Sequence, residues 1–214
     1  MTTAKGKRAS LPGSAAEVVS ALFERRTAVM LEFADHGDAV ARTAYAMAER
    51  FHQGGKLLVF GTGGASTDAQ HVAVEFAYPV TVGKRALPAV SLTADIATVT
   101  AIAARDGMAD IFAHQIRHLA EPADIAVGIS VDGNCASVLA GLLAARERGM
   151  LTVALVGGSA DAIAVSPAVD YLLRTASTDP RIVKEVHVTT YHVLWELVHA
   201  FFEQPPLLGS QAVS

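Results

Sequence analysis

Residues 56–75 read KLLVFGTGGASTDAQHVAVE, and this stretch decides how the chain folds. Its apolar run Leu57-Leu58-Val59-Phe60 lacks polar alternation, which is typical of a strand that is buried on both faces of a parallel sheet. The run stops at Gly61-Thr62-Gly63-Gly64, and a helical pattern follows. The stretch therefore predicts a strand, a tight glycine turn and a helix from about Ser66 to Tyr78.

The same alternation continues towards the C-terminus. Further apolar runs occupy 89–92, 125–129, 151–156 and 171–173, and helical patterns occupy about 95–104, 109–119, 135–148 and 180–203. Strands that alternate with helices predict an α/β fold, a doubly wound parallel five-stranded sheet flanked by helices, of the flavodoxin-like or Rossmann-like kind.

Two further helices, at about 14–36 and 38–54, are predicted before the first strand. Ser14 and Glu17 have the spacing of a capping box at the start of the first of them. No linker or repeat divides the chain. We therefore predict one domain over 14–204 that includes the helical pair, a flexible tail at 1–13 and a C-terminal tail at 205–214.

Composition restricts the class of protein. The 214 residues carry 17 Lys and Arg against 21 Asp and Glu, and 51% of them are hydrophobic. This hydrophobic content excludes intrinsic disorder, and the mild negative charge argues against a nucleic-acid partner. The single cysteine, Cys135, excludes a disulfide framework, and no apolar run approaches the ~20 residues of a membrane span. We expect a cytoplasmic protein with no membrane partner.

Two loops at the carboxyl ends of predicted strands are candidates for ligand binding. In Gly61-Thr62-Gly63-Gly64 the glycines let the backbone approach a ligand, and the following helix N-terminus favours an anion. Ser66 stands where a dinucleotide-binding fingerprint requires glycine, so that motif is excluded. The second loop is Ser130-Val131-Asp132-Gly133-Asn134-Cys135. A tight strand-to-helix turn without any ligand is the alternative interpretation of the glycine loop.

Three ionisable residues are candidates for chemistry. His71 and Glu75 are four residues apart on one predicted helix and therefore share a face. His192 lies on the last helix, where His187 diverges from it by roughly 140° of helical rotation, so these two histidines cannot point into one site. The alternative for each histidine is an ordinary core or surface role.

Taken together, these segments resemble the SIS (sugar isomerase) domain, and in particular the bacterial phosphoheptose isomerases. The resemblance runs from about residue 15 to 203. Its matching stretches are VFGTGGASTDAQHVAVE at 59–75, DIF at 110–112, DIAVGISVDGNCASVL at 124–139, AARERGMLTV at 144–153 and EVHVTTYH at 185–192.

The resemblance implies a homotetramer and an acid/base pair, Glu75 and His192, that moves a proton between adjacent sugar carbons. It implies a possible zinc ion held by His71, Glu75 and His192, with Lys184 at a position where relatives carry a glutamine ligand. Three protein ligands and a water form a normal catalytic zinc shell. The substrate-binding residues that it implies are Gly63, Gly64, Ser66, Asp95, Ser130, Asp132, Asn134, Arg181 and Lys184.

The chain departs from this family pattern in its phosphate-binding loops. Thr62 and Ala65 replace an Asn and a Ser, and Asp132 places a negative charge where a phosphate is expected. Arg181 and Lys184 are two additional cations in this region. They could bind an anion in a rearranged pocket, or pair with Asp132 and leave a site for a neutral ligand.

The sequence therefore predicts a phosphosugar isomerase of the phosphoheptose isomerase type. It would interconvert a ketose phosphate similar to sedoheptulose 7-phosphate and an aldose phosphate. The alternative is a non-catalytic SIS protein, either a sugar-phosphate sensor or a tetrameric assembly factor resembling the replication-initiator-associating protein. Retention of His192 beside Glu75 favours the enzyme.

Overall fold

A computed structural model describes residues 14–158 and 161–204. The five strands form one parallel sheet in the order β2 (Ala89–Ser91), β1 (Leu57–Gly61), β3 (Ile125–Ser130), β4 (Leu151–Val156) and β5 (Tyr171–Arg174). The α-helices are α1 (Ala15–Ala34), α2 (Gly37–His52), α3 (Gly64–Ala77), α4 (Ile96–Arg105), α5 (Ile111–Leu119), α6 (Ala136–Glu147), α7 (Asp161–Ala164) and α8 (Pro180–Glu203). The doubly wound α/β prediction is confirmed, and the predicted tails lie outside the described residues.

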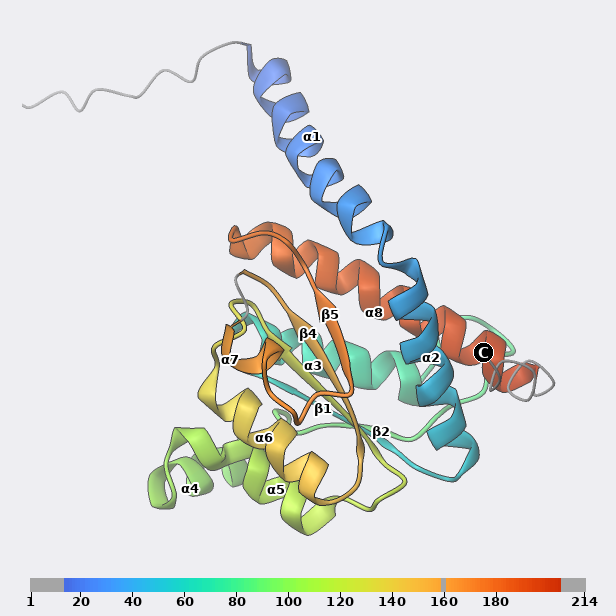
Figure 1. The fold of residues 1–214 in the computed structure, drawn as a ribbon, viewed down its shortest axis with the longest axis vertical. Coiled ribbons are helices and arrows are strands. Elements are labelled where there is room, and N and C mark those ends of the chain that lie inside the picture. The colour runs from blue at the N-terminus through green and yellow to red at the C-terminus, as the bar shows by residue number, and fades with distance from the viewer. Residues whose placement is uncertain (1–13, 159–160, 205–214) are drawn as a thin grey trace, which may run out of the picture.

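Helices cover both faces of the sheet (Figure 1). Successive residues of β1 alternate between two hydrophobic clusters. Val59 belongs to the cluster that includes residues of α2, α3 and α8, and Phe60 to the cluster that includes residues of α4, α5 and α6. Because both faces are covered, every residue of β1 is buried, which explains the uninterrupted apolar run.

The glycine turn after β1 is tighter than predicted, and α3 begins at Gly64 instead of Ser66. A side chain at Gly61 would place its Cβ 2.8 Å from the carbonyl oxygen of Ile129, so only glycine allows the strand to pass directly into the helix. Gly63, with φ of 57°, makes the reversal itself. The sequence prediction missed two short elements, α7 and a 3₁₀ turn at Met108–Asp110.

The first helix extends away from the sheet (Figure 1). It begins at the predicted capping box, in which Ser14 and Glu17 bond to each other's backbone N–H groups. Its apolar side chains are largely exposed, and Phe23 and Leu31 are 68% and 64% accessible. No helix among the described residues is long and apolar enough to cross a membrane.

Candidate active site

Helices α3 and α8 bring the three predicted ionisable residues together. His71 Nε2 lies 3.1 Å from Glu75 Oε1, one turn along α3. His192 of α8 packs its ring edge-on against that of His71, with 5.1 Å between the ring centroids. One side-chain ligand atom from each of the three residues lies within 4.8 Å of the others. The predicted sharing of a face by His71 and Glu75 is therefore confirmed.

Two aromatic residues of α8 support this group, and the sequence prediction missed both. The Tyr191 hydroxyl lies 2.9 Å from His71 Nδ1, and the Trp195 indole Nε1 donates a hydrogen bond of 2.9 Å to the backbone oxygen of Glu75. Burial and the nearby carboxylates of Asp68 and Glu75 raise the pKa of Tyr191 above its ordinary value, so its hydroxyl stays protonated. In the sequence, only their positions relative to His192 could have indicated this role: Tyr191 directly precedes His192, and Trp195 follows it by about one helical turn.

His187 lies apart from this group, as predicted. It is 1% exposed, and neither ring nitrogen has a hydrogen-bond partner among the described residues. Burial lowers the pKa of His187 to about 4, so the ring is neutral at physiological pH.

The donor set of His71, Glu75 and His192 fits a zinc ion. Two imidazoles and a carboxylate are ordinary zinc ligands, and tetrahedral ligands at ~2.0–2.1 Å from zinc are ~3.3 Å apart. The 3.1 Å between His71 Nε2 and Glu75 Oε1 is close to that spacing. Glu75 is the less accessible of that pair, with 14% of its side chain exposed against 42% for His71.

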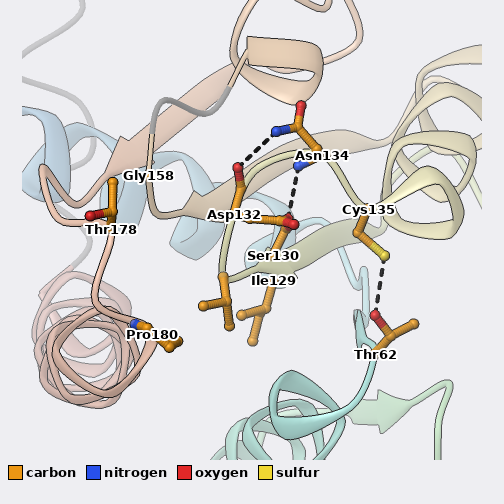
Figure 2. A pocket seen from close by; sticks show the side chains of 10 residues that line it. Thr62, Ile129, Ser130, Asp132, Asn134, Cys135, Gly158, Thr178 and Pro180 are labelled. Carbon is orange, nitrogen blue, oxygen red and sulfur yellow. Dashed lines mark hydrogen bonds between the residues drawn. The ribbon is translucent and has the colours of Figure 1, made fainter.

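A cavity of about 610 Å³ opens at the carboxyl ends of β1 and β3 (Figure 2). Ten residues line it: Thr62, Ile129, Ser130, Val131, Asp132, Asn134, Cys135, Gly158, Thr178 and Pro180. Asp132 is the only one of the ten with a formally charged side chain, so no lysine, arginine or histidine from the described part of the chain lines this cavity. Strand-end cavities of parallel sheets are ordinary ligand sites.

The Asp132 carboxylate accepts hydrogen bonds from two donors of its own loop. Its Oδ1 accepts from the Ser130 hydroxyl at 3.1 Å and from the backbone N–H of Asn134 at 3.0 Å. The Asn134 side chain points across the loop, where its Oδ1 accepts from the backbone N–H of Ala162. The structure thus places Ser130, Asp132 and Asn134 together at the cavity. The Asp132 carboxylate accepts the hydrogen bonds that a bound anion would otherwise accept.

Cys135 connects the two candidate ligand-binding loops, 61–64 and 130–135, through a contact with Thr62. Its Sγ lies 3.1 Å from Thr62 Oγ1 and 3.3 Å from Ser137 Oγ. Burial opposes ionisation, but hydrogen bonds from Ser137 and Thr62 outweigh it and lower the pKa of the Cys135 thiol.

The structure pairs each of the two additional cations with a carboxylate other than Asp132. Their role in binding a substrate anion stays a prediction. Arg181 donates from Nε and Nη2 to the Asp179 carboxylate at 3.0 and 2.8 Å, which lowers the pKa of Asp179 well below its usual range. Lys184 Nζ donates to Asp68 Oδ1 at 2.5 Å and to the backbone oxygen of Gly64 at 3.0 Å. The suggested pairing with Asp132 is wrong, because a nearer carboxylate holds each cation.

The remaining predicted substrate-binding residues have local structural roles. Gly63 and Gly64 form the start of α3, where the Ser66 hydroxyl donates to the Gly63 carbonyl at 2.7 Å. Asp95 caps α4, because its carboxylate accepts from the backbone N–H and the hydroxyl of Thr98. These contacts leave open the predicted binding of a substrate by the same residues.

Comparison with known proteins identifies the class of this protein. A family profile described as SIS domain matches residues 23–157. The chain is therefore an SIS-domain protein, in agreement with its parallel sheet and strand-end cavity.

Individual relatives narrow the class to one family. The phosphoheptose isomerase of Solidesulfovibrio magneticus is 42% identical over 178 residues, which cover 83% of this chain and 86% of that protein. The one from a Roseiflexus species is 39% identical over 166 residues, 77% of this chain and 83% of that protein. The solved structure of the Neisseria gonorrhoeae phosphoheptose isomerase matches with a TM-score of 0.80 at 30% identity, over 87% of this chain and 100% of that one. The chain belongs to the phosphoheptose isomerase family.

Proposed function

We propose that this protein is an aldose–ketose isomerase that interconverts sedoheptulose 7-phosphate and the corresponding aldoheptose 7-phosphate. The observation that carries the proposal is the convergence of Glu75 and His192, from two helices, in a chain that is 42% identical to a phosphoheptose isomerase. The cavity beside the N-termini of α3 and α8, whose lining does not include Glu75 or His192, is the proposed place for the phosphate end of the sugar.

The isomerisation needs two proton transfers, one at carbon and one at oxygen. In this proposal the Glu75 carboxylate removes the proton from the carbon next to the carbonyl and returns it to the neighbouring carbon. His192 gives a proton to the carbonyl oxygen and takes one from the adjacent hydroxyl. The hydrogen bond from Trp195 to the backbone of Glu75 holds α3 and α8 in register, so that both groups face the same sugar atoms.

We also propose that His71, Glu75 and His192 hold a zinc ion, which would polarise the sugar oxygens when bound. The support is the donor set and its spacing. Glu75 has two carboxylate oxygens, so one can ligate while the other faces the substrate. Lys184 is not a ligand in this proposal, because its ammonium group has no lone pair and is bonded to Asp68.

A homotetramer is proposed on the basis of the exposed apolar side of α1. An apolar cavity of about 350 Å³ lies between α1, α2 and α8, beside Met30 and Phe33. Contiguous apolar surface of this kind marks an association site in a soluble protein. Sedimentation should give four times the chain mass, and Phe23→Glu should yield smaller species, whereas Val82→Glu, at a fully exposed loop position, should not. A parent that sediments as a monomer at micromolar concentration would contradict the tetramer.

The activity is tested by turnover of sedoheptulose 7-phosphate. Glu75→Gln and His192→Asn should each lower kcat by at least ~100-fold, the usual contribution of a positioned acid or base. His118→Asn, at an exposed position of α5, is the matched control and should retain full turnover. Parental turnover in both active-site variants, or a parent that turns over no heptose phosphate, would refute the proposal.

A further inference from the structure

Tyr191 is a buried residue whose one side-chain polar atom faces the proposed metal group. The residue is 3% exposed, and its hydroxyl lies 2.9 Å from His71 Nδ1. Its ring packs edge-on against His71 and His192, with centroid distances of 5.4 and 4.9 Å. It therefore touches both histidines, and its hydrogen bond is directed at one of them.

The two nitrogens of His71 have different partners. Nε2 faces Glu75 and Nδ1 faces Tyr191. A neutral imidazole carries one proton, so Nε2 offers a lone pair only when Nδ1 carries that proton. A proton on Nδ1 requires an acceptor in line with it, and the Tyr191 oxygen occupies that position.

We propose that Tyr191 is a positioning residue that holds His71 with its proton on Nδ1 and its Nε2 lone pair directed at the metal. The inference rests on the proposed metal site. Acceptors of this kind fix the tautomer and the ring orientation of metal-binding histidines in general.

A tyrosine hydroxyl suits this position because it both donates and accepts. When His71 carries its proton on Nε2, Tyr191 donates to Nδ1 and the Nε2–H donates to Glu75. With a metal bound, His71 would carry its proton on Nδ1 and donate a hydrogen bond to the Tyr191 oxygen, which would leave Nε2 unprotonated. The 2.9 Å contact between the Tyr191 hydroxyl and His71 Nδ1 serves both tautomers of His71. Because Tyr191 is buried, bulk water cannot take over either role when the hydroxyl is removed.

The experiment measures zinc affinity by competition with a chromophoric chelator. Tyr191→Phe should weaken zinc binding by about 10- to 100-fold, the usual effect of losing such a partner. Tyr45→Phe is the matched control, because the buried Tyr45 hydroxyl has no hydrogen-bond partner among the described residues. Equal affinity in the parent and in Tyr191→Phe would overturn the proposal.

A double-mutant cycle tests whether Tyr191 acts through His71. In a His71→Ala background, Tyr191→Phe should cause no further loss of zinc affinity, whereas an equal loss in both backgrounds would overturn the proposal. If Tyr191→Phe does not fold, nitrogen-15 NMR of the zinc-loaded parent decides instead. A protonated Nδ1 in His71 supports the proposal, and a protonated Nε2 overturns it.

Isomerase turnover by the parent is measured alongside, so that the two proposals are separated. A parent that turns over heptose phosphate but shows no effect of Tyr191→Phe on zinc affinity retains the proposed function and loses this inference. A parent that binds no zinc loses this inference together with the metal site. A parent that binds zinc with the predicted tyrosine effect but lacks turnover loses the proposed function alone.

Discussion

Asp132→Asn should strengthen the binding of phosphate and sugar phosphates. The substitution removes one negative charge from the cavity and keeps an oxygen that can accept from Ser130 and from the backbone N–H of Asn134. The local loop structure is therefore expected to persist. No cation of the described chain lines the cavity to offset the carboxylate, so its removal is uncompensated.

The size of the effect follows from the charge and the surroundings of Asp132. Two unit charges 4 Å apart repel by about 1 kcal/mol in water and by about 4 kcal/mol at an effective dielectric constant of 20. Asp132 is exposed at the rim of a cavity, so its environment lies between these limits. Affinity for a phosphate monoanion should therefore rise by a factor between about 5 and several hundred.

Calorimetric titration with inorganic phosphate and with sedoheptulose 7-phosphate measures this gain. The gain should shrink in 1 M salt, where the Debye length falls to about 3 Å. Asp35→Asn, at an exposed position at the end of α1, controls for total charge and should change nothing. A gain below three-fold at low salt refutes the reasoning. Lost binding would show that Asp132 accepts hydrogen bonds from sugar hydroxyls.

Two further predictions concern stability. Burial lowers the pKa of His187 to about 4, below the ~6.5 of the unfolded chain, so the unfolded state binds more protons between these values and stability rises with pH across that window. In urea denaturation, the free energy of unfolding should fall by about 3 kcal/mol from pH 6.5 to pH 4 because of this residue. The fall should be absent in His187→Leu and retained in His118→Leu. Identical pH profiles for the parent and His187→Leu would contradict the prediction. Lys184→Met leaves the buried Asp68 without its partner and should destabilise the fold by about 1–3 kcal/mol, whereas Arg181→Met, which removes an exposed guanidinium, should destabilise it less. Equal losses in these two variants, measured by urea denaturation, would show that the burial of Asp68 is irrelevant.

The sequence was sufficient to predict the sheet because a strand that is buried on both faces has apolar residues at successive positions. The buried strands β1, β3 and β4 are apolar runs without alternation, and turns between elements carry glycine, as at Gly63 and Gly149. The short elements were missed because four residues, as in α7, are too few to show a helical period. The start of α3 was misplaced by two residues because the sequence does not show how closely Gly61 approaches Ile129.

The acid/base group was predictable and its supporting contacts were not. His71 and Glu75 share a helical face by spacing alone, and that relation survives folding. The choice of carboxylate by Lys184 depends on distances across the fold, where Asp68 competes with Asp132, whereas Arg181 pairs with Asp179, two residues before it in the chain. No sequence period predicts such a competition.

Helices α3 and α8 build both parts of the proposed site, and this argues for chemistry over simple binding. Their N-termini border the cavity, while Glu75 and His192 lie further along the same two helices. A binding protein needs the cavity alone. It gains nothing from holding a largely buried carboxylate beside two imidazoles, which removes charge from water at a cost. Hydrogen bonds from Tyr191 and Trp195 nonetheless fix that group in place. Changes in the packing of α3 against α8 should therefore alter binding and turnover together, whereas a change at Asp132 should alter binding alone.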